Sequence, residues 1–185
     1  MAFFIYNVVM TNYLEAKGWL TELERETLKY LAESAPKTHP IVNIGIEYGA
    51  SVHCLRAGNR SGVIFAVDII GDDKFEGDRD SQMIFHRQPS HMFIDAGMLM
   101  NFSLAFIDGD HGYKGVTIDC QLADRIIKDG FIIFHDCYSW EDPTQVHKLC
   151  PDVNAAVQDW FDAEGEGRFT ELESKDSMRI FQRTA

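Results

Sequence analysis

Two apolar runs that end abruptly in acidic residues constrain the fold of this chain more than any other feature. Residues 104–107 read Leu-Ala-Phe-Ile and are followed at once by Asp108. Residues 131–134 read Phe-Ile-Ile-Phe and are followed by His135 and Asp136. Continuous apolar runs of this length are typical of strands buried on both faces of a parallel sheet. The two runs therefore predict neighbouring strands of an α/β fold.

The segment between the two runs has the spacing of a helix. Val116, Cys120, Ala123 and Ile127 recur at helical intervals, which predicts the order strand, helix, strand. In such a unit both strands point the same way, so their carboxyl ends open on the same edge of the sheet. The acidic residues after the two strands should therefore face one crevice.

Asp108 and Asp136 are predicted to lie close together at that edge. Neighbouring strands are about 4.8 Å apart, so the two carboxylates should approach within several Å if the strands are adjacent. Two ionised carboxylates that close need a proton or a cation between them. Oxygen ligands of this type suit a hard divalent ion such as Mg²⁺. The alternative is that both residues only cap turns and helix starts.

A glycine-bearing turn follows the strand predicted at residues 41–44. It reads Gly45-Ile-Glu-Tyr-Gly49-Ala-Ser51 and leads into a helix predicted at residues 52–57. A strand, a glycine turn and a helix start form a cradle for a nucleotide-like ligand, because the backbone can approach closely and the helix start offers free N–H groups. The GxxxG spacing does not meet the dinucleotide-binding pattern, so a tight turn without a ligand stays open as an alternative.

The next predicted strand, residues 63–67, ends in Asp68. This position is about twenty residues after the glycine turn, where an adenosine ribose would place its two hydroxyls for a carboxylate to accept. The alternative is a turn residue before Gly71. Residues 71–79 are predicted to form a loop, and a short strand is predicted at residues 83–86.

The ends of the chain are predicted to pack around this core. Thr21 begins a helix with Glu24 as its capping partner, and its apolar face contains Leu23, Leu28 and Leu31. A second helix is predicted at residues 153–161. Strands at residues 169–172 and 178–181 are predicted to form a hairpin.

Composition indicates a single globular domain. The chain has 185 residues, and its 45% hydrophobic content is ample for a core. The formal net charge of −12 argues against nucleic acid as a partner, because phosphate binding needs Lys and Arg. The four cysteines lack CxxC spacing and are predicted to be reduced thiols of a cytoplasmic protein.

The first residues also bear on partners. The apolar run at residues 2–10 is too short to span a bilayer and lacks a basic segment before it, so no membrane association is expected. This run is a candidate cover for the mouth of a site or for a partner subunit. The sequence leaves a homo-oligomer open.

Taken together, these segments resemble the class I S-adenosylmethionine-dependent methyltransferases. The likeness is greatest to the group around macrocin-type sugar O-methyltransferases, methyltransferase domain 24. The family pattern V-E-I-G-x-x-x-G-x-S is matched at residues 42–51, with Asn43 in place of Glu. The pattern F-I-D-G-D-H, followed by Y-x-G-V, is matched at residues 106–116, and H-D at residues 135–136. The likeness covers residues 41–138.

The resemblance implies a Rossmann-like, doubly wound and mostly parallel sheet of order 3-2-1-4-5-7-6 with a C-terminal antiparallel hairpin. The single domain would comprise an N-terminal helical cap (1–40), a cofactor and catalytic core (41–138), and a C-terminal helix and hairpin (139–185). The cofactor would contact Asn43, Gly45, Glu47, Tyr48, Gly49, Ser51, Asp68 and Asp108. A metal would be bound by Asp108, Asp136 and His135. Catalysis would use Asp108 together with His111 as the general base.

The predicted function is S-adenosylmethionine-dependent methyl transfer, with Mg²⁺ or another divalent cation assisting the O-methylation of a small hydroxylated acceptor. His111 follows Asp108 by three residues, and an imidazole pKa near 6.5 suits a general base. The alternative for His111 is a helix-start histidine that does not titrate in catalysis. His135 is as well suited to orienting a ligand as to being one.

Two other functions stay open. A non-catalytic S-adenosylmethionine-binding module is favoured by Asn43 and by residues 88–90, Gln-Pro-Ser, which replace the family's G-D-S. A metal-dependent phosphoesterase is the second alternative, because D-x-D-H and H-D clusters also suit two-metal hydrolysis. That function leaves the glycine turn and Asp68 without a purpose.

Overall fold

The computed structural model describes residues 12–95, 100–139, 141–142 and 144–185. The apolar run at residues 2–10 lies outside them, so its predicted role as a cover stays a prediction. The strands are β1 (Ile41–Ile44), β2 (Ile64–Asp68), β3 (Met83–Arg87), β4 (Phe102–Ile107), β5 (Ile126–Phe134), β6 (Phe169–Glu171) and β7 (Arg179–Arg183). The helices are α1 (Glu22–Ser34), α2 (Ala50–Gly58), α3 (Ser90–Asp95), α4 (Tyr113–Asp119) and α5 (Pro151–Trp160).

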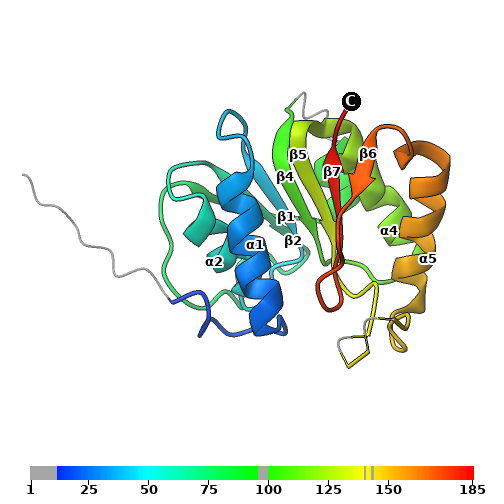
Figure 1. Cartoon of the computed structure of the whole chain (residues 1–185). Helices are drawn as coiled ribbons and strands as arrows, with labels where there is room; N and C mark the ends of the chain where they lie inside the picture. The colour runs from blue at the N-terminus through cyan, green and yellow to red at the C-terminus, as the bar shows by residue number, and fades with distance from the viewer. Residues whose placement is uncertain (1–11, 96–99, 140, 143) are drawn as a thin grey trace, which may run out of the picture.

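The strands form one seven-stranded sheet of order β3-β2-β1-β4-β5-β7-β6 (Figure 1). Strands β1 to β5 are mutually parallel, whereas β7 pairs antiparallel with both β5 and β6. The predicted Rossmann-like sheet, its strand order and its C-terminal hairpin are confirmed. Strands β4 and β5 are neighbours, with Ile107 opposite Phe134, so the residues that follow them leave the sheet side by side.

Alternate residues of the central strands supply two cores. Val42 and Ile107 pack with α4 and α5 on one face, and Leu104 and Phe106 pack with α1 and α2 on the other. Figure 1 shows these two pairs of helices on opposite sides of the sheet. Every residue of β1 and β4 is buried, as continuous apolar runs predict. A fully buried side chain such as Phe106 contributes about 1.5–3 kcal/mol through the hydrophobic effect.

The helix predicted through Ile127 is wrong in its second half. Helix α4 ends at Asp119, a 3₁₀ helix spans Cys120–Arg125, and Ile127 already lies in β5. The extra length of β5 pairs Ile126 with Phe102, and the register then shifts before Leu104. Ile126 is buried in the core, so tertiary packing overrides the helical spacing of this apolar segment.

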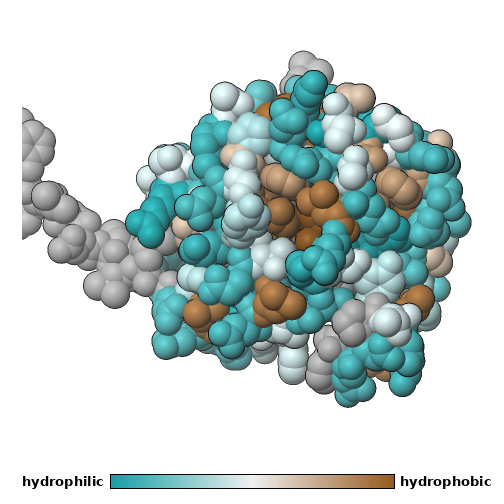
Figure 2. Space-filling view, viewed as in Figure 1, coloured by the Kyte–Doolittle hydropathy of each residue, from teal (hydrophilic) through white to brown (hydrophobic). Residues whose placement is uncertain are grey.

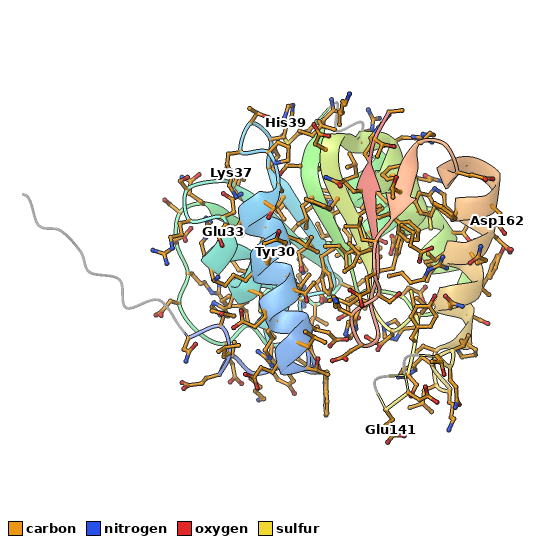
Figure 3. The ribbon with its side chains drawn as sticks, in the orientation of Figure 1. Tyr30, Glu33, Lys37, His39, Glu141 and Asp162 are labelled. Carbon is orange, nitrogen blue, oxygen red and sulfur yellow. The ribbon has the colours of Figure 1, made fainter. Side chains whose placement is uncertain are left out.

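The face of the molecule drawn in Figure 2 is mostly hydrophilic. Glu33 on α1 and Asp162 beyond α5 are exposed, and Figure 3 shows Asp162 at the outer edge of the molecule. Figure 2 shows an apolar area between α1 and β7, where Leu31 and Ile180 line a shallow groove. Among the described residues, none of the helices is both long and apolar enough to cross a bilayer.

Candidate active site

A cavity of about 1380 Å³ lies at the carboxyl ends of the parallel strands. Its lining includes Gly45 after β1, Asp68 at the end of β2, Asp108 after β4 and Asp136 after β5. The volume exceeds the roughly 300–1,000 Å³ typical of a site for one drug-sized ligand. The glycine turn, the acid after β2 and the paired aspartates therefore share one cavity with room for two ligands.

Asp108, His135 and Asp136 form a compact cluster on this edge. One potential ligand atom from each lies within 4.8 Å of the others. His135 Nδ1 is 3.2 Å from Asp108 Oδ1 and 3.4 Å from Asp136 Oδ1. The adjacency of β4 and β5 thus brings the two aspartates together, as the strand-helix-strand pattern predicts.

His111 lies at the open side of the cluster. Its Nε2 is 3.3 Å from Asp108 Oδ1 and 3.5 Å from Asp136 Oδ2. The hydrogen bond to Asp108 raises the pKa of His111 above its usual value, and the charges of both aspartates act in the same direction. Its Nδ1 is 3.5 Å from Cys150 Sγ. Since the His111 side chain is 41% exposed, an acceptor in the cavity can reach it.

Asp108 is held in its ionised form. Burial opposes ionisation, but the charge of His135 and the hydrogen bonds from His111 and His135 outweigh it and lower the pKa of Asp108 to about 2. Asp136 has a left-handed backbone, with φ 56°, at the turn out of β5. A short acidic side chain tolerates this conformation better than most residues.

Glu24, in the first turn of α1, also belongs to the site, although no sequence pattern predicts it there. It is only 1% exposed, and its Oε2 accepts from Thr21 N at 2.9 Å, which completes the predicted capping box. The same oxygen lies 3.3 Å from His135 Nε2. Oε1 accepts from the backbone N and the Oγ of Ser177, at 3.0 and 2.6 Å. The T-x-x-E capping signal predicts the first contact only.

The cofactor end of the cavity is built around Gly45 and Asp68. Gly45 has φ 82°, and a Cβ there would lie 1.9 Å from Asp108 O, so only glycine fits. Asp68 Oδ2 accepts from Ile46 N at 2.8 Å and from Glu47 N at 3.4 Å. Asp68 Oδ2 therefore fixes the glycine turn. Its Oδ1 accepts from Ile70 N at 2.9 Å in the turn before Gly71, as the turn-residue alternative expects, and Asp68 also lines the cavity.

Five of the eight predicted cofactor residues line the cavity: Gly45, Glu47, Ser51, Asp68 and Asp108. Three lie outside the lining. Asn43 is fully buried and donates from Nδ2 to Gly45 O at 2.5 Å. The Tyr48 ring packs under Lys17 Nζ at 3.9 Å, and a Cβ on Gly49 would meet the Phe75 ring. These three residues shape the glycine turn without lining the cavity.

The chain resembles known methyltransferases in sequence and in fold. A methyltransferase domain family model matches residues 42–137, a little over half of the chain. The MycE methyltransferase from the mycinamycin biosynthetic pathway, in complex with Mg, SAH and mycinamycin VI, is similar with a TM-score of 0.66 and 14% identity. That match covers 91% of this chain and 51% of MycE, so the chain spans about half the length of MycE.

Two further solved structures match over most of both chains. The O-methyltransferase NovP has a TM-score of 0.57 and 18% identity, covering 89% of this chain and 81% of NovP. An O-methyltransferase from Bacillus cereus in complex with SAH has a TM-score of 0.57 and 14% identity, covering 90% of this chain and 83% of its own. At these identities the matches establish the fold. No curated protein sequence is significantly similar to this chain.

Proposed function

This chain belongs to the methyltransferase domain family, and we propose that it is an S-adenosylmethionine-dependent O-methyltransferase that uses a divalent metal and a small hydroxylated acceptor. The observation that carries the proposal is the convergence of the Gly45 turn, Asp68 and the cluster of Asp108, His135 and Asp136 on one cavity. MycE and the Bacillus cereus enzyme, which share the fold, were both solved with SAH, and MycE also with Mg.

The residues at one end of the cavity fit the cofactor. Gly45 has no side chain, so its backbone is accessible to a ligand in the cavity. Ser51 lies in the first turn of α2. The carboxylates of Glu47 and Asp68 face the same space. A helix start with free N–H groups suits the carboxylate of a methionine moiety, and an acid suits ribose hydroxyls. When bound, S-adenosylmethionine supplies the methyl group.

The residues at the other end fit a divalent metal. Asp108 and Asp136 offer carboxylate oxygens and His135 offers a ring nitrogen, with these atoms within 4.8 Å of one another. Such a donor set can complete a metal coordination shell together with water and substrate oxygens. When bound, the metal lowers the pKa of an acceptor hydroxyl and fixes its direction.

His111 would receive the proton of the acceptor hydroxyl at Nε2. This nitrogen faces Asp108 and Asp136 and is open to the cavity, so it is within reach of a hydroxyl placed at the cluster. The two carboxylates would stabilise the imidazolium that forms. Neutral His111 is the form that can act as the base, so activity should fall as the pH drops below the pKa of His111.

The mouth of the cavity favours a neutral acceptor with an apolar body. Among the described residues, Leu149, Trp19 and Ile69 are the most exposed large hydrophobic side chains, at 88%, 81% and 70%, and all three line this cavity. Apart from its histidines, its charged lining consists of Lys114 and six acids: Glu24, Glu47, Asp68, Asp108, Asp110 and Asp136. An anionic acceptor would be repelled by this lining, whereas an apolar surface would bury against the three exposed side chains.

Calorimetry with S-adenosylmethionine and SAH, with and without a divalent metal, tests the proposal against its alternatives. The methyltransferase should bind both nucleosides and, with metal present, should methylate neutral hydroxylated acceptors that carry an apolar body faster than nucleotide sugars. A phosphoesterase would bind metal but neither nucleoside. A non-catalytic module would bind nucleoside with no response to metal and no turnover. We further propose a cytoplasmic location and no nucleic-acid or membrane partner.

A further inference from the structure

We propose that His135 gives the metal site a nitrogen ligand, that Glu24 positions this histidine, and that the site therefore prefers a first-row transition metal such as Mn²⁺ or Co²⁺ to Mg²⁺. The inference rests on the proposed function, because it concerns the metal of the same cluster. It changes the expectation from the sequence, which is that Mg²⁺ suits the two aspartates.

The two ring nitrogens of His135 face different partners. Nδ1 points into the cluster, 3.2 Å from Asp108 Oδ1 and 3.4 Å from Asp136 Oδ1. Nε2 points the other way, toward Glu24 Oε2 at 3.3 Å. The side chain is only 5% exposed, and the Phe106 ring lies beside it with ring centroids 6.0 Å apart. His135 is therefore held in one orientation with Nδ1 directed to the metal position.

Glu24 fixes which nitrogen carries the proton. An ionised carboxylate can only accept hydrogen bonds, so Nε2 must be the donor. Glu24 is only 1% exposed, and its Oε2 faces His135 Nε2 at 3.3 Å, so this carboxylate is the acceptor for the Nε2 proton. Ser177 donates twice to the other Glu24 oxygen and stops the carboxylate from turning. With this proton held on Nε2, loss of the Nδ1 proton would leave a neutral His135 whose Nδ1 lone pair faces the cluster.

This arrangement is the one that orients metal-binding histidines, in which the nitrogen that does not bind metal donates to a carboxylate. Glu24 is thus a positioning residue that acts through His135. The ligand set would be two carboxylates and one imidazole. Imidazole suits first-row transition metals, whereas Mg²⁺ prefers oxygen ligands and keeps its water. Mn²⁺ and Co²⁺ should therefore bind more tightly than Mg²⁺.

Glu24→Gln tests the positioning role in the full-length chain. An amide nitrogen facing Nε2 would force His135 to carry its proton on Nδ1, where it blocks metal binding. Asp176→Asn is the matched control. It makes the same acid-to-amide change, and Asp176 accepts from Thr21 Oγ1 at 2.5 Å, so it supports the same helix start. Asn tolerates the left-handed backbone of residue 176, φ 49°.

The probes are Mn²⁺, Co²⁺ and Mg²⁺, and the affinity of each metal alone is measured by calorimetry. Pulsed EPR of bound Mn²⁺ detects nitrogen coupling from a coordinating imidazole. The wild-type protein should bind Mn²⁺ and Co²⁺ at least about 10-fold more tightly than Mg²⁺ and should give the nitrogen signal. Glu24→Gln should lose roughly 10–100-fold in Mn²⁺ and Co²⁺ affinity, and Asp176→Asn should match the wild type.

A second variant, His135→Asn, tests the inference if Glu24→Gln does not fold, or if its side-chain amide rotates so that the oxygen faces Nε2. It should lose the nitrogen signal and the preference for Co²⁺ over Mg²⁺. A signal that survives in His135→Asn would come from another histidine, such as His111, and would overturn the inference.

The remaining outcomes separate this inference from the function on which it rests. Equal wild-type affinities for Co²⁺ and Mg²⁺ would overturn the nitrogen ligand but leave a metal-assisted methyltransferase intact. An equal loss of Mn²⁺ affinity in Asp176→Asn and Glu24→Gln would assign the effect to helix packing and remove the positioning role. SAH binding with no metal binding at all would overturn both this inference and the metal assistance.

Discussion

A Cβ atom on Gly45 would lie 1.9 Å from the main-chain carbonyl oxygen of Asp108. The turn that follows β1 therefore rests directly on the chain that leaves β4, and β1 and β4 are paired neighbours in the sheet. The cofactor end of the cavity and its metal end are consequently built as one unit. A substitution in the turn should therefore affect both the cofactor end and the metal end of the cavity.

Gly45→Ala should destabilise the protein more than strain alone can explain. Gly167→Ala is the control, because Gly167 has a similar φ of 80° but no atom within 4 Å of its added Cβ. The left-handed backbone should cost each variant about 1–2 kcal/mol. Gly45→Ala should lose roughly 2 kcal/mol more and bind SAH weakly, because the Asp108 backbone must move. Urea unfolding and SAH calorimetry measure both effects, and equal losses in the two variants would contradict the close approach.

Asp136→Asn should separate the metal end from the cofactor end. The amide keeps the size of the side chain and tolerates φ 56°, but it removes one of the two charges that would hold the metal. Metal affinity and metal-dependent turnover should each fall by about 100-fold or more, while SAH affinity in the absence of metal should stay within about threefold of wild type. Calorimetry with each ligand measures this. A parallel loss of SAH binding would show that the two ends cannot be assigned separate roles.

His111 should set the acidic limb of the pH–rate profile. The neutral imidazole that acts as base is lost as the pH falls through the pKa of His111, which the hydrogen bond to Asp108 raises above 6.5 in the metal-free protein. His111→Gln should lower kcat about 10²–10⁴-fold and remove that limb. Histidine NMR titration of the metal-free protein checks the direction of the shift. A pKa of His111 at or below 6.5, or an unchanged limb in the variant, would rule out this role.

Asp119 should make the protein less stable as the pH rises from about 4 to about 6. It is fully buried on α4, and burial raises its pKa to about 6, although a hydrogen bond from the Ser90 side chain acts in the opposite direction. The native state therefore keeps a proton that the unfolded chain, with an ordinary pKa near 4, has already released. Stability falls with pH wherever the native state binds more protons, so the loss is complete above about pH 6.

Asp119→Asn should remove this part of the pH dependence. Between pH 4 and pH 7 the wild type should lose on the order of 2 kcal/mol relative to the variant. Asp162→Asn, at an exposed acid, should keep the wild-type slope. Urea unfolding at several pH values measures the difference. The same slope in Asp119→Asn and wild type would mean that Asp119 is ionised in the native protein at low pH.

The fold was largely predictable because its signals are local. The buried runs before Asp108 and His135 identify the central strands, and the glycine turn identifies the start of α2. The helical spacing gave a wrong prediction at Ile127, because apolar residues at this spacing can also form a buried strand. At the start of α1, Leu23 was predicted to face the core, but it is 47% exposed and Glu24 is buried. The capping box turns Glu24, rather than Leu23, toward the sheet.

The metal end of the candidate site was predictable only in part. Asp108, His135 and Asp136 follow adjacent strands, so the topology places them together. The contact of Glu24 with His135 joins residues 111 positions apart, and its contact with Ser177 joins residues 153 positions apart. Such a contact depends on how α1 and the β6–β7 hairpin pack against the sheet, which no local pattern encodes. The exposure of Trp19 and Leu149 at the cavity mouth is likewise a tertiary property.

The most direct test of the account is a crystal structure of the protein grown with SAH and Mn²⁺, with anomalous diffraction to locate the metal. SAH should lie between Gly45 and Asp68, and a single Mn²⁺ peak should lie within bonding distance of Asp108 and Asp136 in the same cavity. A cavity without SAH, or a Mn²⁺ peak remote from both aspartates, would contradict it.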